Sequence, residues 1–155
     1  MLTSKQIGSQ AEMVACHFLQ KHGLTLKEQN FVALNPAGKR CGEIDLVMMD
    51  CACYVFVEVK LRAQEDYGDT LEMINPAKQG RVKLAAKYYL TQNGLWDRVN
   101  SRFDVIGITP AYNDHSQQKI VWIKNAFEVQ YWAQKIKQQN NERRYGYIFP
   151  HQTNF

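Results

Sequence analysis

The sequence has no apolar run approaching the ~20 residues that a membrane-spanning helix needs, and its N-terminus lacks the apolar core of a secretion signal. We therefore expect a cytoplasmic protein without a membrane partner. Cysteine is also scarce, since the 155 residues contain four cysteines and no Cys-X-X-Cys pair. Cys51-Ala52-Cys53 is a poor match to zinc-ligand spacing, so we expect reduced thiols in place of a zinc site or a disulfide framework.

The remaining composition is that of a small globular protein with a mild excess of positive charge. The formal net charge is +4, which permits a polyanionic partner without requiring one. A chain of this length can bury one core, and no internal repeat or linker divides it. We predict a single domain over residues 1–139, followed by a separate tail over residues 140–155.

Two apolar runs carry charged residues for which a buried strand has little room. Gly42-Glu43-Ile44-Asp45-Leu46-Val47 is followed along the chain by Val57-Glu58-Val59-Lys60. Burying an unpaired carboxylate costs on the order of several kcal/mol, so buried acids are usually paired or bound to a metal. A half-solvated strand with outward-facing charges is the simpler alternative, and Glu58 and Lys60 taken alone fit it equally well.

The two runs are typical of neighbouring antiparallel strands, residues 43–49 and 54–61, joined by a tight turn at Cys51-Ala52. In that register Asp45 lies directly opposite Glu58, with Cβ atoms roughly 4.5–5.5 Å apart. Two carboxylates at this separation repel each other unless a cation lies between them. The register therefore predicts a divalent cation at this pair, with Mg²⁺ a good fit to the gap.

The same register places Glu43 opposite Lys60, so all four charges share one face of the hairpin. Toward the turn that face becomes apolar, which confines the charges to one end. A slip of one residue would move Asp45 and Glu58 to opposite faces. The other face is predicted to be apolar and to carry Ile44, Leu46, Val55, Val57, Val59 and Leu61.

The chain resembles the PD-(D/E)XK nuclease superfamily, because an acid is followed by a spacer and then by Glu-X-Lys on a strand. A longer series, over roughly residues 5–130, is similar to the bacterial YraN family of endonuclease-like proteins, which is itself similar to archaeal Holliday-junction resolvases. Two departures, Ile44 in place of the superfamily's proline and Leu61 where the family often has threonine, remove no charged group. The matching segments are, in order, Gly8-Ser9-Gln10-Ala11-Glu12, Asn30-Phe31, Gly42 to Val47, Val55 to Arg62, Arg102-Phe103-Asp104-Val105 and Asn125-Ala126-Phe127.

The resemblance implies an α/β fold with a restriction-endonuclease-like core of αβββαβ type, in which helices flank a mixed sheet. It implies that Asp45 and Glu58, with the carbonyl of Val59, hold Mg²⁺ or Mn²⁺. Lys60 would position the attacking water or stabilise developing charge. Glu12 matches the superfamily's helical acid that assists the metal or the water. Glu43 is expected to pair with Lys60 or to contact the metal ligands without touching the metal itself.

Local patterns supply a scaffold of the same order. Apolar periodicity predicts a first helix from Thr3 or Ser4 to about His22, and it places Glu12 on the flank of the apolar stripe, where a glutamate is usually solvated. Asn75-Pro76 is a cap followed by a first-turn proline, and it starts a second helix that Gly94 ends. The other expected elements are an extended segment over 24–34, an acidic loop over 63–74, strands over 102–109 and 119–124, and a final helix over 126–139.

The second predicted helix carries basic residues and no acid, which suits contacts with a phosphate backbone. A solvated surface rich in lysine explains the same pattern equally well. Lys78 differs from the others because it lies in the first turns near the apolar side, which would direct it back toward the sheet. The expected nucleic-acid-binding residues are Arg62, Lys78, Arg81, Lys83 and Lys87.

Three functions remain open at this point. The first is a DNA endonuclease that prefers branched DNA, for which a homodimer would suit a junction with two symmetric cuts. The second is a nucleic-acid-binding module that lacks its own catalytic activity and works with a partner. The third is a metal protein or adaptor that acts through the tail over 140–155, where basic and aromatic residues mix without periodicity. A flexible terminus is the more common behaviour of such a tail.

Overall fold

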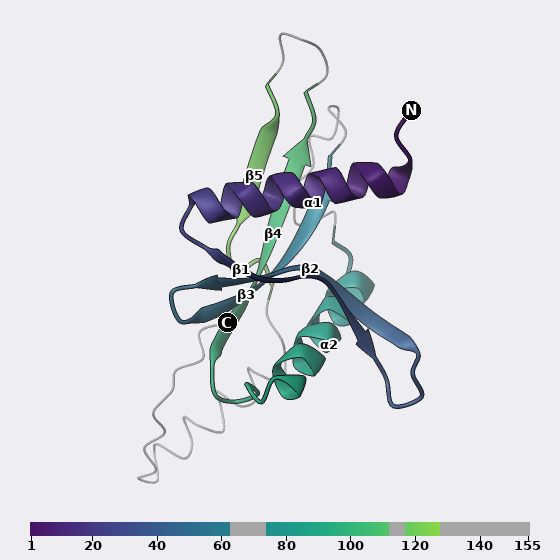
Figure 1. The fold of residues 1–155 in the computed structure, drawn as a ribbon, viewed down its shortest axis with the longest axis vertical. Coiled ribbons are helices and arrows are strands. Elements are labelled where there is room, and N and C mark those ends of the chain that lie inside the picture. Colours follow the sequence, from purple (N-terminus) through teal and green to yellow (C-terminus); the bar gives the residue numbers. More distant parts are fainter. Residues whose placement is uncertain (63–73, 112–116, 128–155) are drawn as a thin grey trace.

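The computed structural model describes residues 1–62, 74–111 and 117–127 (Figure 1). Within these ranges the chain alternates helices and strands in the order that the sequence predicts, which confirms the α/β fold class. The elements are α1 (Ser4–Lys21), β1 (Thr25–Leu34), β2 (Arg40–Asp50), β3 (Cys53–Leu61), α2 (Pro76–Gln92), β4 (Asn100–Thr109) and β5 (Lys119–Ile123).

The helix boundaries follow from their capping residues. Thr3 is the N-cap of α1, and its hydroxyl accepts from the backbone N–H of Gln6 while the Gln6 side chain bonds back to Thr3. Asn75 is the N-cap of α2, where its side chain accepts from the backbone N–H of Lys78, and Pro76 follows in the first turn. Both predicted helix starts are confirmed.

The five strands form one mixed sheet in chain order, β1-β2-β3-β4-β5. Only β3 and β4 run parallel, and α2 makes the crossover between them. Asp50 pairs with Cys53 across the β2–β3 turn, where Cys51 adopts a positive φ of 52°. This is the register that the sequence predicts, and it holds as far as the pair Leu46↔Val57.

The two helices pack on opposite faces of the sheet and define two apolar cores (Figure 1). α1 covers one core, which contains Leu46, Met48, Val55 and Val57 from the central strands. α2 covers the other, which contains Val47 and Phe56. Adjacent residues of β2 and β3 thus alternate between the two cores, as a sheet buried on both faces requires.

Several predicted segments lie outside the described residues. These are most of the acidic loop, the final helix beyond Phe127 and the tail over 140–155. The proposed domain boundary at residue 139 lies there too and stays a prediction. Neither helix of the described ranges has the length and apolarity to span a membrane.

Candidate metal and nucleic-acid site

The alternation of side chains along β2 breaks at Asp45. Ile44 and Val47 both pack in the core under α2, although they are three residues apart and a regular strand would place them on opposite faces. On the neighbouring strand Asn30 has a positive φ of 52°, and it lies between the pairs Gln29↔Leu46 and Phe31↔Ile44. The two strands are therefore irregular at the same level. The prediction that Ile44 joins Leu46 on the other face is wrong for this reason.

Asp45 bonds to β3 through its side chain at this level. Its Oδ2 accepts a hydrogen bond of 2.7 Å from the backbone N–H of Val59. Burial raises the pKa of the Asp45 carboxyl, while this hydrogen bond and the charges of Lys78 and Lys60 lower it. Val59 thus contacts the site through its N–H, and the expected role of its carbonyl oxygen as a metal ligand stays a prediction.

Glu58 directly follows Val57 of the apolar core on β3, with only 2% of its surface exposed. Its Oε1 is 3.1 Å from Lys78 Nζ and 3.4 Å from Lys60 Nζ. Its Oε2 is buried and has no hydrogen-bond partner among the described residues. Burial and then the charge of Asp45 raise the pKa of Glu58 to about 7, in spite of the two lysines. The pKa is raised because a charged carboxylate is costly to bury and lies near a second acid, and such shifts are frequent at functional sites.

Glu43 extends the ion-pair network beyond the predicted partner. It is paired with Arg40, three residues before it, and with Lys78 Nζ at 3.5 Å. The prediction that Glu43 pairs with Lys60 is wrong, since Lys60 contacts Glu58.

Glu12 reaches the site from α1. Burial and then the charge of Asp45 raise the pKa of Glu12, whereas a hydrogen bond from the Asn30 side chain lowers it. Glu12 is only partly exposed, so it is directed at the sheet more than a residue on a solvated flank would be. The structure therefore brings Glu12 to the same level of the sheet as Asp45. Asn30 had no predicted role, although asparagine is among the non-glycine residues most often found at a positive φ.

α2 lies directly on β2 near the site. A Cβ atom added to Gly42 would be 2.4 Å from the backbone oxygen of Arg81, so only glycine permits this approach. The close contact carries Lys78, in the first turn of α2, over the end of β2. The predicted direction of Lys78 toward the sheet is thereby confirmed.

The remaining basic residues lie apart from this cluster. Arg81 and Lys87 are exposed on α2, and Lys87 Nζ is 5.9 Å from the ring centroid of Trp96. Lys83 is half-buried, with its Nζ 5.6 Å from the ring centroid of Phe127. Arg62 follows β3, and its backbone N–H donates to Ile108 O at 2.7 Å.

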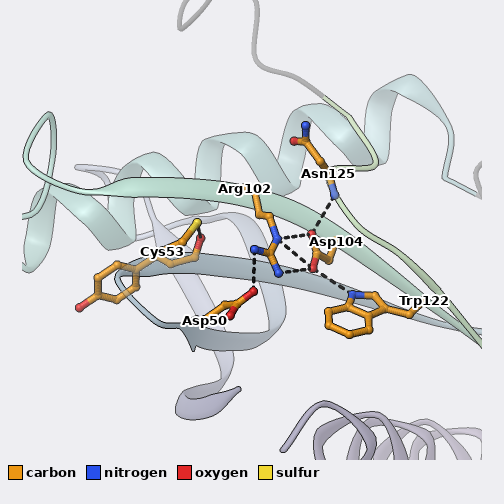
Figure 2. A network of polar contacts seen from close by, with 7 residues as sticks. Asp50, Cys53, Arg102, Asp104, Trp122 and Asn125 are labelled. Carbon is orange, nitrogen blue, oxygen red and sulfur yellow. Dashed lines mark hydrogen bonds and ion pairs between the residues drawn. The ribbon is translucent and has the colours of Figure 1, made fainter. Parts of the chain in front are cut away.

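A second charged network, which the sequence analysis did not assign, joins β4 to its neighbours (Figure 2). Asp104 is fully buried and accepts hydrogen bonds from Arg102 Nε at 3.0 Å, Trp122 Nε1 at 2.9 Å and the backbone N–H of Asn125 at 2.9 Å. Arg102 Nη1 is also 2.9 Å from Asp50 Oδ2. Every oxygen of Asp104 is satisfied within the protein, so this network links β2, β4 and β5 as a structural element.

The donor atoms at the first cluster suit a hard cation. Asp45 and Glu58 offer carboxylate oxygens, and the part of the chain that the structure describes supplies no donor to the buried Oε2 of Glu58. Within residues 1–62, 74–111 and 117–127, no group of three or more His, Cys, Asp or Glu side chains is close enough to hold a metal ion. The described residues thus provide two carboxylates of the oxygen type that Mg²⁺ and Mn²⁺ prefer, and water or a phosphate would have to supply further ligands.

The chain matches a known protein family over the segment that carries this cluster. The model of the "Uncharacterised protein family UPF0102" matches residues 11–108, a segment that contains Glu12, Asp45, Glu58 and Lys78. The chain belongs to the UPF0102 family. UPF0102 proteins of Nitrosococcus oceani and Marinobacter nauticus are 41% and 42% identical to it, over 83% and 81% of the chain and 96% and 95% of the relatives. A UPF0102 protein of Coxiella burnetii is 39% identical, over 83% of the chain and 97% of the relative.

Proposed function

We propose that this UPF0102 protein is a metal-dependent DNA endonuclease that prefers branched DNA and hydrolyses phosphodiester bonds. The proposal rests on Glu58, an almost fully buried acid whose pKa is raised by burial and by the charge of Asp45. Two acids so arranged destabilise a fold at neutral pH, and such strain is typical of functional sites. The nuclease resemblance of the same residues supports the assignment.

Asp45 and Glu58 would hold Mg²⁺ or Mn²⁺, with the Val59 carbonyl as a further ligand. When bound, the ion would act as a Lewis acid that activates water and neutralises charge on the phosphate. The Val59 N–H fixes one oxygen of Asp45, which leaves the other to face the site. Lys60 contacts Glu58 and keeps 30% of its side chain exposed, so its ammonium can also meet a substrate phosphate.

Glu12 would help to position the water from the side of α1, since its carboxyl interacts with Asp45 and is held by Asn30. The exposed Arg81 and Lys87 would contact the DNA backbone, with Lys83 and Arg62 contributing less accessible charge. Contacts of this kind are electrostatic and largely independent of sequence, which suits an enzyme that recognises a DNA shape.

Cleavage of a four-way junction, a flapped duplex and a linear duplex with Mg²⁺ or Mn²⁺ tests the proposal. We expect the wild type to cut the branched substrates, and Asp45→Asn and Glu58→Gln to lose on the order of 100-fold or more of the rate. Glu28→Gln, which changes an exposed acid on β1, should cut at the wild-type rate. Equal cutting by all four proteins would contradict the proposal.

A second candidate is a nucleic-acid-binding module that needs a partner for catalysis. It is favoured by the ion pairs of Glu58, since two lysines already compensate this acid, and by the absence of a three-ligand group within the described ranges. Steeply salt-dependent binding to DNA without cutting under either metal would favour this candidate over the first.

A further inference from the structure

Lys78 is the cation that touches the most acids of the candidate site. Its Nζ is 3.1 Å from Glu58 Oε1 and 3.5 Å from Glu43 Oε1, and only 17% of its side chain is exposed. A lysine that contacts a phosphate backbone would be expected on the open surface of α2, as Arg81 is. The position of Lys78 points to a role inside the site.

The backbone of α2 fixes this position. The N–H of Lys78 donates to the capping side chain of Asn75 at 2.9 Å, and Ile74 before the cap is buried. One turn further along, Arg81 lies so close to Gly42 that no side chain fits between the two elements. The first turn of α2 is therefore held against β2. Because the helix cannot shift, the Lys78 ammonium is fixed beside Glu58.

Glu58 and the acids beside it on β2 already have cationic neighbours within the protein. Three cationic side chains lie beside three acids, and two of the cations contact Glu58. The charges of the same two lysines also lower the pKa of Asp45. A divalent cation at Asp45 and Glu58 would bring its charge close to the Lys78 ammonium, and like charges a few ångströms apart repel strongly at a half-buried position. The acids are Glu43, Asp45 and Glu58, and the cations are Arg40, Lys60 and Lys78.

We propose that Lys78 is a positioning residue that acts as a built-in counter-cation of Glu58, and that a divalent cation must displace it to bind there. The proposal rests on the metal site of the proposed function. It adds that Lys78 competes with the divalent cation for Glu58 and so lowers the affinity for the metal. Occupation of the site by metal and engagement of Lys78 with Glu58 are then alternatives. The metal-free protein keeps its buried acid compensated by this lysine.

Binding of Mn²⁺ without DNA, followed by the paramagnetic resonance signal of the free ion, tests the competition. Lys78→Met keeps the length of the side chain and removes its charge, so it should bind Mn²⁺ more tightly than the wild type by about tenfold. Lys78→Arg keeps the charge and should bind as weakly as the wild type. Lys21→Met, which removes an exposed charge at the end of α1, controls for net charge and should also match the wild type.

Thermal unfolding supplies a second readout that a purely structural lysine would not give. In chelator at pH 8, Lys78→Met should unfold about 3–6 °C below the wild type, because Glu58 loses a partner. Saturating Mn²⁺ should close or reverse that difference, since the ion replaces the lost charge. The Lys78→Arg protein should follow the wild type under both conditions.

Three results would overturn the proposal: Mn²⁺ binding by Lys78→Met no tighter than by the wild type, equally tight binding by Lys78→Arg and Lys78→Met, or a Tm deficit that Mn²⁺ leaves unchanged. Cleavage is measured separately. Tighter Mn²⁺ binding by Lys78→Met in a protein that never cuts DNA would uphold the competition and refute only the nuclease activity. Metal-dependent cutting by the wild type, with the same Mn²⁺ affinity in Lys78→Met, would uphold the nuclease activity and refute the competition.

Discussion

Replacing Glu58 with glutamine should make the metal-free protein more stable above neutral pH. The folded protein gives this carboxyl a pKa of about 7, against an ordinary value of 4.5. Between these two values the folded chain keeps a proton that the unfolded chain has released. The stability contributed by the protonated acid is therefore present below about pH 4.5 and is lost as the pH rises to about 7.

The size of the effect follows from the same two pKa values. Their separation corresponds to about 3 kcal/mol between the protonated and the ionised carboxyl. The side chain of Glu58 is only 3% exposed, so solvent screens little of this cost. Glutamine resembles the protonated acid at every pH. Glu58→Gln should thus match the wild type near pH 4.5 and exceed its free energy of unfolding by up to about 3 kcal/mol at pH 8.

Urea unfolding in chelator from pH 4.5 to 8.5 measures this difference. Titrating groups that do not interact with Glu58 behave alike in both proteins and cancel in the comparison. Thermal unfolding in the same buffers should give Glu58→Gln a Tm roughly 6–12 °C above that of the wild type at pH 8. The exposed-acid variant Glu28→Gln should show no such trend. A difference between Glu58→Gln and wild type that is independent of pH, or a less stable Glu58→Gln at pH 8, would refute the reasoning.

Three other substitutions test the supports of the site. Gly42→Ala should cost about 2 kcal/mol in urea unfolding, because its Cβ meets the Arg81 backbone; full stability would show that α2 can move. Asn30→Ala should be about 1 kcal/mol less stable than Asn30→Gly, which tolerates the positive φ, and equal stability would argue against that conformation. Asp104→Asn should lose about 3–5 kcal/mol, since it breaks a buried ion pair and the Trp122 hydrogen bond; a loss below 1 kcal/mol or so would contradict the network.

Much of the fold could be predicted because its signals are local. Thr3 and Asn75-Pro76 specify helix starts through capping, and the tight turn at Cys51-Ala52 sets the β2–β3 register. That register placed Glu58 on the same face as Phe56, under α2. The pattern of charges within apolar runs therefore located the candidate site before any tertiary contact was known.

The arrangement of the site depended on contacts between distant segments. The change of alternation at Asp45 involves the positive φ of Asn30 on another strand, and a period of two along one strand carries no sign of it. Lys78 could be directed to the sheet from its place on α2, but its two carboxylate partners follow from the packing of Arg81 on Gly42. The Asp104 network was missed because two of its donors, Trp122 and Asn125, lie in or just after β5 and far from Asp104 in the sequence.

The most direct test of the central claim is anomalous scattering from crystals soaked in Mn²⁺. We expect a single-site peak within about 2.0–2.6 Å of a carboxylate oxygen of both Asp45 and Glu58, the range of metal–oxygen distances for hard divalent cations. The peak should be absent from Glu58→Gln crystals soaked in the same way. Fully ordered Asp45 and Glu58 side chains without a peak between them, at saturating Mn²⁺, would contradict the account.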